Sequence, residues 1–259
     1  MTALFQADNI SIRFGGIRAV DSVSFEVQKG EVFSIIGPNG AGKTTIFNLI
    51  SRIYNSTEGR LVFDGQDITR TPPYRIAGLG IARTFQNIEL FANATLLQNL
   101  LIGRHCHSDV GFLSQLAFLP STRRAELHHR EKAEEVIAFL GLQRYRDSLI
   151  ANLPYGVRKV VELGRALCTE PRLLLLDEPS SGLNVEETEG MGFWIEDIKR
   201  DLGVTVIMVE HDMSLVSQVS DRVMALNYGK VLAMGTSQEV QTHPEVVRAY
   251  IGGEVEAEA

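Results

Sequence analysis

Cysteine, basic charge and long apolar runs are all scarce in this 259-residue sequence. Cys106 and Cys168 are its only cysteines, too few for a disulfide framework and consistent with a reducing compartment. No apolar run approaches the roughly 20 residues of a membrane-spanning helix, and the N-terminus lacks the basic-then-apolar order of an export signal. We therefore expect a soluble cytoplasmic protein.

Basic residues are outnumbered by acidic ones, 25 against 32. Phosphate contacts need a basic face, so we do not expect a nucleic-acid binder. The run His105-Cys106-His107 is the one hint of a metal site, but adjacent side chains diverge and no second pair with zinc spacing follows. With 44% hydrophobic residues and no internal repeat, the chain has the length of one large domain or two modest ones.

A glycine-rich segment, GPNGAGKTT, stands at residues 37–45. The apolar run 32–36 precedes it as a buried strand would, and apolar residues recur at helical spacing over 46–50. Strand, glycine loop and helix in this order turn a Walker A match into a phosphate-binding loop. We predict that nucleotide binds Gly37, Pro38, Asn39, Gly40, Ala41, Gly42, Lys43, Thr44 and Thr45.

Each part of such a loop has a physical role. The three glycines let the backbone turn with its N–H groups pointing inward, where a side chain would block a polyphosphate. The following helix adds its positive N-terminal end. We expect Lys43 to contact the β- and γ-phosphates of ATP, and Thr44 to offer its hydroxyl to Mg²⁺.

A second apolar strand ends in two acids, in the sequence LLLLDE at residues 173–178. This is the Walker B pattern, in which Asp177 emerges beside the Mg²⁺ held by Thr44. Glu178 is then placed to polarise a water in line with the γ-phosphate, which is general-base work. The plain alternative is a strand that ends at two solvated acids, and the upstream loop favours the catalytic interpretation.

Three further residues complete a possible site. Phe14 offers a ring to adenine, Gln86 an amide to Mg²⁺ and the attacking water, and His211 follows a second buried strand at 204–209. Taken singly, each has a plainer interpretation, as a core ring, a surface amide and a helix cap.

The rest of the sequence predicts a mixed α/β core interrupted by a mainly helical lobe. Alternating residues 23–27 predict a strand before a turn at Lys29-Gly30, and hairpin turns are expected at Asp64-Gly65 and around Gly229. A charged amphipathic helix should stop at Gly141. The final helix should run over 244–251 and close at Gly252.

Together, Phe14, the glycine loop, Gln86, a segment around Gly156, LLLLDE and His211 resemble the ATP-binding cassette (ABC) family across nearly the whole chain. The resemblance implies that Phe14 stacks on adenine, that Gln86 forms the Q-loop and that Glu178 is the catalytic carboxylate. It also implies that His211 is the switch histidine, which holds the γ-phosphate, and that residues 181–184 form the D-loop. Asn184 and Glu187 also make a capping box for the next helix.

The same resemblance implies an α/β P-loop NTPase fold, an ABC nucleotide-binding domain spanning residues 1–259. It comprises a RecA-like core with a mixed sheet and an N-terminal antiparallel β subdomain, in residues 1–90 and 166–251. An α-helical subdomain, residues 91–165, is inserted, and residues 252–259 form a flexible tail.

Residues 14–16, 82–86, 181–184, 210–213 and 248–252 look like the branched-chain amino acid importer cassette of the LivG type. That resemblance implies an ATPase that works with two transmembrane permeases, a second cassette and an extracytoplasmic binding protein. The cassette pair is a heterodimer or a homodimer, on the cytoplasmic side of the inner membrane. The transported substrate stays open, since another amino acid, an amide, urea or an aromatic acid fits as well.

The ABC signature, usually Leu-Ser-Gly-Gly-Gln, is altered here to Leu153-Pro154-Tyr155-Gly156-Val157. In the family this segment begins a helix that closes over the γ-phosphate bound by the opposite subunit. The missing serine removes a hydrogen bond to phosphate, and losing one costs about 1.5–3 kcal/mol. The alteration raises a second possibility, a nucleotide-gated binding module without useful turnover, which the intact Glu178 and His211 disfavour. A soluble ABC ATPase acting on DNA or the ribosome is a third, disfavoured by the acidity and the absence of sustained heptads.

Overall fold

The computed structural model describes residues 3–107 and 120–256 of the chain, which form two sheets and the surrounding helices. The first sheet is antiparallel, in the order β2-β1-β4-β5. The second is mixed, in the order β10-β9-β3-β8-β7-β6, and only β10 runs antiparallel to its neighbour. Their strands are β1 (Ala3–Phe14), β2 (Ile17–Gln28), β3 (Val32–Ile36), β4 (Glu58–Phe63), β5 (Gln66–Asp67), β6 (Ile81–Arg83), β7 (Leu173–Asp177), β8 (Thr205–Val209), β9 (Arg222–Asn227) and β10 (Lys230–Gly235).

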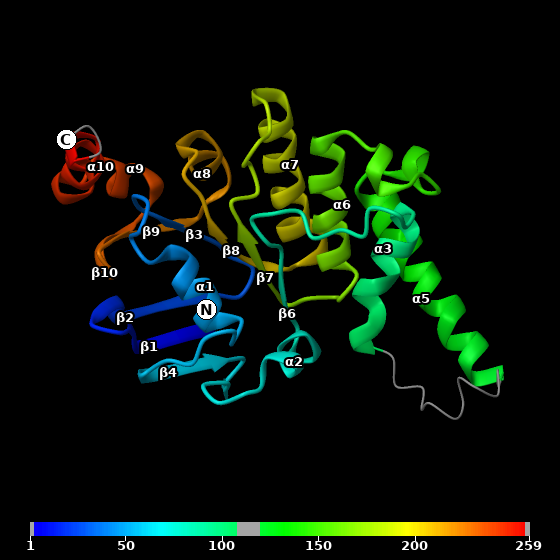
Figure 1. Cartoon of the computed structure of the whole chain (residues 1–259), viewed down its shortest axis with the longest axis horizontal. Helices are drawn as coiled ribbons and strands as arrows, with labels where there is room; N and C mark the ends of the chain where they lie inside the picture. The colour runs from blue at the N-terminus through cyan, green and yellow to red at the C-terminus, as the bar shows by residue number, and fades with distance from the viewer. Residues whose placement is uncertain (1–2, 108–119, 257–259) are drawn as a thin grey trace.

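Most of the helices lie above the mixed sheet or beside it (Figure 1), whereas the helix after the glycine-rich segment lies between the two sheets. They are α1 (Lys43–Ile50), α2 (Pro73–Ile76), α3 (Leu96–Gly103), α5 (Pro120–Phe139), α6 (Tyr155–Leu167), α7 (Val185–Leu202), α8 (Met213–Val219), α9 (Ser237–Gln241) and α10 (Pro244–Glu256). The described residues also form short 3₁₀ turns between these elements, η1 (Ala77–Leu79), η2 (Arg104–His107), η3 (Gln143–Tyr145) and η4 (Ile150–Asn152).

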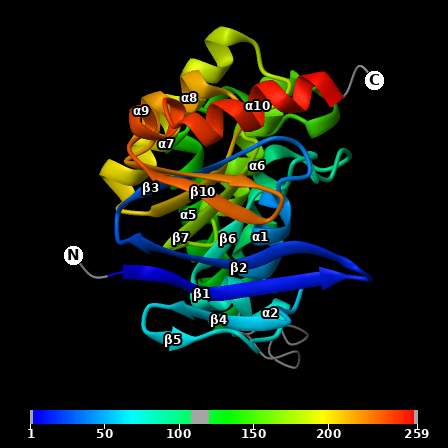
Figure 2. The ribbon, with the colours of Figure 1, turned by 90° about the vertical axis from the view of Figure 1, so that its left-hand side faces the viewer.

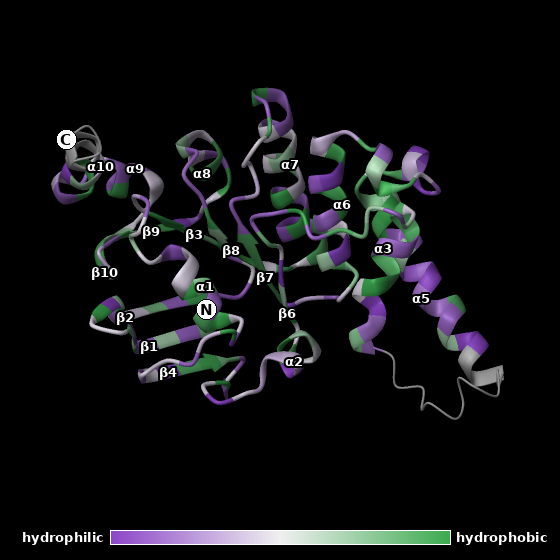
Figure 3. Cartoon of the chain, viewed as in Figure 1, coloured by the Kyte–Doolittle hydropathy of each residue, from purple (hydrophilic) through white to green (hydrophobic). Residues whose placement is uncertain are grey.

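The mixed sheet is buried on both faces, which explains its nearly continuous apolar strands. In β7, Leu174 and Leu176 pack among residues of α6, α7 and α8, whereas Leu173 and Leu175 face α1 and the antiparallel sheet. This alternation follows from the two-residue period of a strand. The layers are visible in Figure 2, with the antiparallel sheet below and α8, α9 and α10 above. In Figure 3, β7 and β8 are mostly hydrophobic, whereas α5 is mostly hydrophilic.

The local predictions on strands and turns are confirmed. The predicted hairpins join β4 to β5 and β9 to β10, and the helix ahead of Gly141 ends at Phe139. The capping box at the start of α7 is present, with Asn184 and Glu187 each accepting from the other's backbone N–H. The fold class is the predicted one.

The predicted end of the last helix at Gly252 is wrong. Helix α10 runs on through Gly252 and Gly253 to Glu256. Glycine lowers helix propensity by about 1 kcal/mol but ends a helix only where it takes a left-handed conformation, and glutamate beyond it favours helix. Of the predicted flexible tail, residues 257–259 lie outside the described residues.

The parallel strands bring the sequence motifs to one edge of the sheet. The glycine loop follows β3, the Walker B acids end β7, Gln86 follows β6 and His211 follows β8. Since β3, β8, β7 and β6 are neighbours in this order, their carboxyl ends lie together. Across the described residues, no helix is long and apolar enough to cross a membrane.

Candidate functional site

The glycine loop wraps tightly between its neighbours. Gly37, Gly40 and Gly42 all have positive φ, at 151°, 80° and 105°. A Cβ on Gly37 would lie 2.3 Å from the carbonyl oxygen of Leu226, and one on Gly42 would lie 2.6 Å from that of Ala19. Glycine is therefore required at these two positions for two reasons: the backbone has positive φ, and a neighbouring carbonyl oxygen lies where a Cβ would be.

Lys43 is the first residue of α1, and its side chain lies back over the glycine loop. Its ammonium donates hydrogen bonds to the carbonyl oxygens of Gly37, at 2.6 Å, and Pro38, at 3.1 Å. Burial lowers the pKa of Lys43, and the charges of Glu178 and Asp177 oppose that shift. The lysine and the two Walker B acids thus share one electrostatic neighbourhood, as the motifs require, with Thr44 exposed beside them.

Asp177 has an ion-pair partner that the sequence did not reveal. The guanidinium of Arg83, at the end of β6, donates to Oδ2 of Asp177 at 2.7 Å, and both side chains are buried. Arg83 also donates to Asn48 and Ser51 of and after α1, so it joins β6 and β7 to that helix. Burial raises the pKa of Asp177, and the hydrogen bond from Arg83 opposes the rise. The only sign of this ion pair in the sequence is a single arginine at the end of a short apolar strand.

Replacing Arg83 by leucine is expected to lower the free energy of unfolding by about 3–5 kcal/mol, because it leaves a buried carboxylate unpaired. Urea denaturation at pH 7 measures the change. Arg60→Leu is the matched control, since its pair with Asp67 is about half exposed and such pairs contribute about 0–1 kcal/mol. A similar loss of unfolding free energy in both variants would show that the Arg83–Asp177 pair contributes no more to stability than an exposed pair.

Glu178 and Gln86 meet directly. The side-chain Nε2 of Gln86 donates to Oε2 of Glu178 at 2.7 Å. Glu178 has φ of 50°, uncommon for a residue with a side chain, and its N–H donates to the Val209 carbonyl of β8 at 2.9 Å. The neighbouring strand therefore holds the backbone in the conformation that turns this carboxylate toward Gln86.

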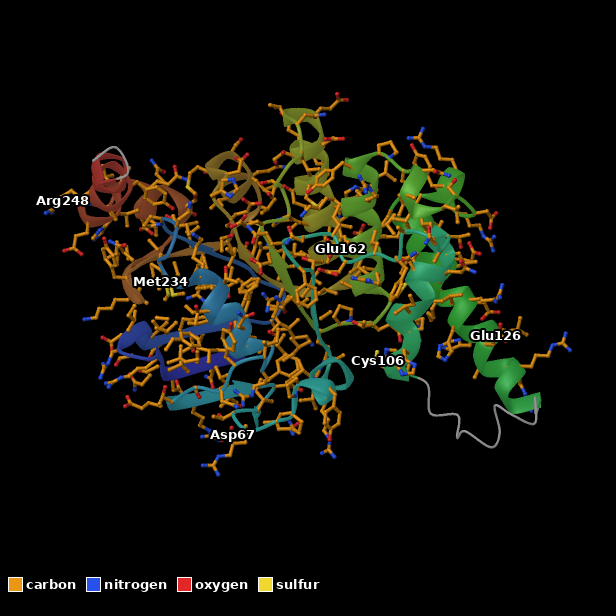
Figure 4. The ribbon with its side chains drawn as sticks, viewed as in Figure 1. Asp67, Cys106, Glu126, Glu162, Met234 and Arg248 are labelled. Carbon is orange, nitrogen blue, oxygen red and sulfur yellow. The ribbon has the colours of Figure 1, made fainter. Side chains whose placement is uncertain are left out.

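Side chains of α6 hydrogen-bond to the backbone of residues 85–89, the segment around Gln86. Lys159 donates to the Gln86 carbonyl at 3.1 Å, Arg165 donates to the Glu89 carbonyl, and Glu162 accepts from the Phe85 N–H at 3.4 Å. These three side chains are spaced three apart and so lie near one another on the helix. Glu162, labelled in Figure 4, lies toward the centre of the molecule. A continuous contact path therefore joins Glu178, Gln86 and α6.

His211 is set at the edge of this group, with its side chain 61% exposed. Its backbone is fixed from both sides, because the buried Glu210 accepts from its N–H and Asp212 caps α8. Its nearest acidic atom is Oε2 of Glu210, 3.7 Å from Nδ1. Among the described residues, no hydrogen bond or ion pair joins the ring to Lys43, Gln86 or Glu178.

Phe14 is exposed at the end of β1, where an adenine ring could reach it. Its ring contacts the edge of Tyr54, with centroids 5.1 Å apart. Tyr54, on the loop after α1, is a second aromatic at this position that the sequence interpretation missed. An exposed tyrosine in a loop carries no local signal of such a pairing.

The altered signature begins α6 as the resemblance implies, with Pro154 at the N-cap position. Tyr155 packs over Gly182, and its hydroxyl donates to the Ser181 carbonyl at 3.2 Å. The substituted signature is therefore packed against the D-loop of its own chain. Gly156 lies in the first turn of α6, where a Cβ would meet the carboxylate of Glu187 at 2.3 Å.

The predicted ligands for Mg²⁺ are a hydroxyl, an amide and a carboxylate, on Thr44, Gln86 and Asp177. These hard oxygen donors suit Mg²⁺. Arg83 bonds only Oδ2 of Asp177, and the described residues give Oδ1 no hydrogen bond. The residues present thus fit this ion. Elsewhere, the described residues hold no group of three metal-ligating side chains, and His107 bonds the Thr169 carbonyl.

Comparison with known proteins is consistent with this geometry. Residues 20–181 match the ABC transporter family, and residues 230–256 match the branched-chain amino acid ATP-binding cassette transporter family. The chain is 39% identical to the high-affinity branched-chain amino acid transport ATP-binding protein BraF of Pseudomonas aeruginosa, over 96% of this chain and 98% of that protein. It is 38% identical to LivG of Escherichia coli K12, with the same coverage.

Solved structures agree. An ATP-binding cassette of an ABC transporter in its ADP conformation superposes with a TM-score of 0.85 and 33% identity, covering 97% of this chain and all of that one. A nucleotide-free cassette gives 0.84 at 33% identity, covering 96% and 99%. The chain therefore belongs to the ABC transporter family, in the group of branched-chain amino acid transport ATP-binding proteins, and its activity is ATP hydrolysis.

Proposed function

We propose that this ATPase powers an importer for branched-chain amino acids, as a peripheral subunit on the cytoplasmic side of the cell membrane. The relatives named for such transport, at 38–39% identity over 96% of the chain, are the observation that carries the substrate class. Subunits of this family work with membrane permease components. The full assembly would contain two permeases, a second cassette and an extracytoplasmic binding protein.

The proposed chemistry uses side chains that the fold brings to one edge of the sheet. The glycine loop and Lys43 hold the phosphates of ATP, while Phe14 stacks on its adenine. Thr44, Gln86 and Asp177 would hold Mg²⁺, which neutralises charge on the phosphates when bound. Glu178 takes a proton from the attacking water, and His211 contacts the γ-phosphate.

We further propose that residues 91–165 act as a helical subdomain that moves with nucleotide, against a core of residues 1–90 and 166–251. The contacts of α6 with residues 85–89 support this proposal, because they join the lobe to Gln86. One shared hydrophobic cluster runs from α3 and α5 to the mixed sheet, so both parts belong to one domain. Gly156, at the start of α6, would face the nucleotide of the second cassette.

A permease contact is expected just past Gln86, at residues 87–91. In this segment Leu90 packs partly against the core, whereas Phe91 is 59% exposed. Beside it, between core and helical lobe, lies a cavity of about 410 Å³ whose lining includes the exposed Ile53, Phe85 and Ile102. Exposed apolar surface of this kind marks an interaction site. Of Leu90 and Phe91, only Phe91 therefore presents an exposed side chain for docking.

Phe91→Asp is expected to lower transport at least about tenfold while the ATPase of the purified chain stays within twofold, because a charge in an apolar contact costs more than about 1.4 kcal/mol. Uptake into proteoliposomes and ATP hydrolysis measure the two effects. Phe193→Asp on α7 is the matched control, since Phe193 is 60% exposed. Unchanged uptake in the Phe91 variant would refute docking at this residue.

Uptake also tests the substrate class. The chain is assembled in proteoliposomes with its permeases, second cassette and binding protein, and ATP-dependent uptake of labelled leucine, isoleucine and valine is compared with that of urea, a short amide and an aromatic acid. Preference for the branched-chain amino acids is expected. Preferred uptake of urea, amide or aromatic acid would overturn the substrate assignment while leaving the ATPase intact.

A further inference from the structure

Glu210 is a fully buried carboxylate to which neither the sequence motifs nor the proposed chemistry gives a role. It follows β8 directly, and its side chain is 0% exposed. Oε1 accepts the backbone N–H of Ser180 at 2.8 Å. Oε2 accepts the N–H groups of His211, at 2.8 Å, and Asp212, at 3.2 Å. A carboxylate that accepts three backbone N–H groups anchors the backbone at three points, and each of these hydrogen bonds contributes to stability.

The donors come from two different turns. Ser180 lies two residues past Glu178, in the turn after β7, whereas His211 and Asp212 begin the turn after β8. These strands are hydrogen-bonded neighbours in the sheet (Figure 1). The Glu178 N–H also reaches back to the last residue of β8, Val209, at 2.9 Å. The backbone after Glu178 and that around His211 are therefore joined at two points, and within the described residues Glu210 supplies the only side-chain hydrogen bond between the two turns.

A buried cation completes the surroundings of Glu210. Lys159 of α6 is 4% exposed, and its ammonium donates to the Gln86 carbonyl at 3.1 Å. Burial lowers the pKa of Lys159, while the charges of Glu162 and Glu210 raise it. The buried carboxylate is thus surrounded by three N–H donors and lies near the charge of Lys159. This cation also belongs to the helix that holds the Gln86 segment.

We propose that Glu210 is a positioning residue for ATP hydrolysis, whose carboxylate holds the turn at Ser180 and the turn at His211 as one rigid unit. His211 has an exposed ring and, in this part of the structure, no side-chain partner of its own nearer than Glu210 at 3.7 Å. Its place relative to Glu178 is therefore set through its backbone, and the backbone is set by Glu210. The inference rests on the proposed role of His211 at the γ-phosphate.

The test is Glu210→Gln in the 259-residue chain. The glutamine keeps the size of the side chain but replaces one acceptor oxygen by an NH₂ group, so at least one of the three N–H groups loses its partner. We expect kcat for ATP to fall about 10- to 100-fold. The KM for ATP should stay within twofold, because Lys43 and the glycine loop are untouched.

Glu31→Gln is the matched control for loss of a buried carboxylate. Glu31 is 7% exposed, accepts the Gln28 N–H and pairs with Arg222, at the opposite end of β3 from the glycine loop. Thermal unfolding of both variants is recorded. We expect Glu31→Gln to lose stability with kcat unchanged within twofold. A fall in kcat equal to that of Glu210→Gln would overturn the proposal, since both would then report general destabilisation.

A double-mutant cycle with His211→Ala distinguishes a role of Glu210 in positioning His211 from a role in stabilising the fold. If Glu210 acts through His211, adding Glu210→Gln to His211→Ala lowers kcat by less than twofold further. If the fold-loss in kcat of the double variant equals the product of the two single losses, the proposal is overturned. A kcat for Glu210→Gln within twofold of the parent, with His211→Ala inactive, would overturn it and leave the proposed function standing. Full activity of His211→Ala would overturn both. If Glu210→Gln does not fold, Glu210→Asp replaces it under the same criteria.

Discussion

Replacement of Lys43 by alanine is expected to weaken ATP binding roughly 30- to 4,000-fold. Removing one partner of a buried, hydrogen-bonded charge pair costs about 2–5 kcal/mol, and each 1.4 kcal/mol is tenfold in affinity. Lys43 is buried and already aimed along the loop, through its bonds to the Gly37 and Pro38 carbonyls. Its ammonium therefore meets the phosphates in a site with little competing water. Titration calorimetry with ATP and Mg²⁺ measures the change.

Lys199→Ala provides the control, because that ammonium is paired with Asp221 near the end of α7. It should bind ATP as the parent does. The alanine at 43 also removes two hydrogen bonds to the loop, so thermal unfolding without nucleotide checks its fold. ATP should then raise the Tm of the parent and of Lys199→Ala but not of Lys43→Ala. Equal affinity in all three proteins would show that the glycine loop does not hold the phosphates.

The glycine loop and the buried strands were predictable because each is a pattern of consecutive residues in the sequence. The apolar run of β7 and the order of glycines in residues 37–45 can be interpreted without a distant partner. Arg83 is different, since its partner Asp177 lies 94 residues away. The sequence shows both residues, but only the register of β6 beside β7 brings them together.

The same limit explains Glu210. Its type is that of a surface residue, and the sequence offered it only as part of Glu210-His211-Asp212-Met213. Its burial follows from the adjacency of β7 and β8, which places the Ser180 N–H within 2.8 Å of a residue 30 positions later. Local pattern thus found the residues proposed to touch nucleotide, whereas the residues that orient them depend on strand order.

The altered signature makes a contact within its own chain that a motif comparison alone does not reveal. Tyr155, in place of a small residue, covers Gly182 and bonds the Ser181 carbonyl. A Cβ at Gly182 would lie 2.8 Å from the tyrosine ring, so the two positions are matched. The segment therefore gains a contact with its own D-loop where Pro154 has removed a serine hydroxyl.

Glu178→Gln is expected to lower kcat about 10²- to 10⁴-fold, the usual contribution of a general base, while ATP affinity stays within threefold. Glutamine fills the same space beside Gln86 but cannot take a proton from water. Steady-state hydrolysis and nucleotide titration measure the two quantities. Glu189→Gln, an exposed acid on α7, is the matched control and should leave both unchanged. A variant with more than a tenth of the parental kcat would exclude Glu178 as the base.

In the proposed pair of cassettes, the same substitution tests whether the two sites are equal. The site built on Lys43, Asp177 and Glu178 would face the signature of the second cassette, whereas this chain presents Pro154 and Val157 to the other site. If the partner carries a complete signature, Glu178→Gln should remove most of the ATPase activity of the complex. The matching change in the partner should then remove little, because that site already lacks a hydrogen bond worth about 1.5–3 kcal/mol. Equal losses from the two substitutions would show that the altered signature does not slow its site.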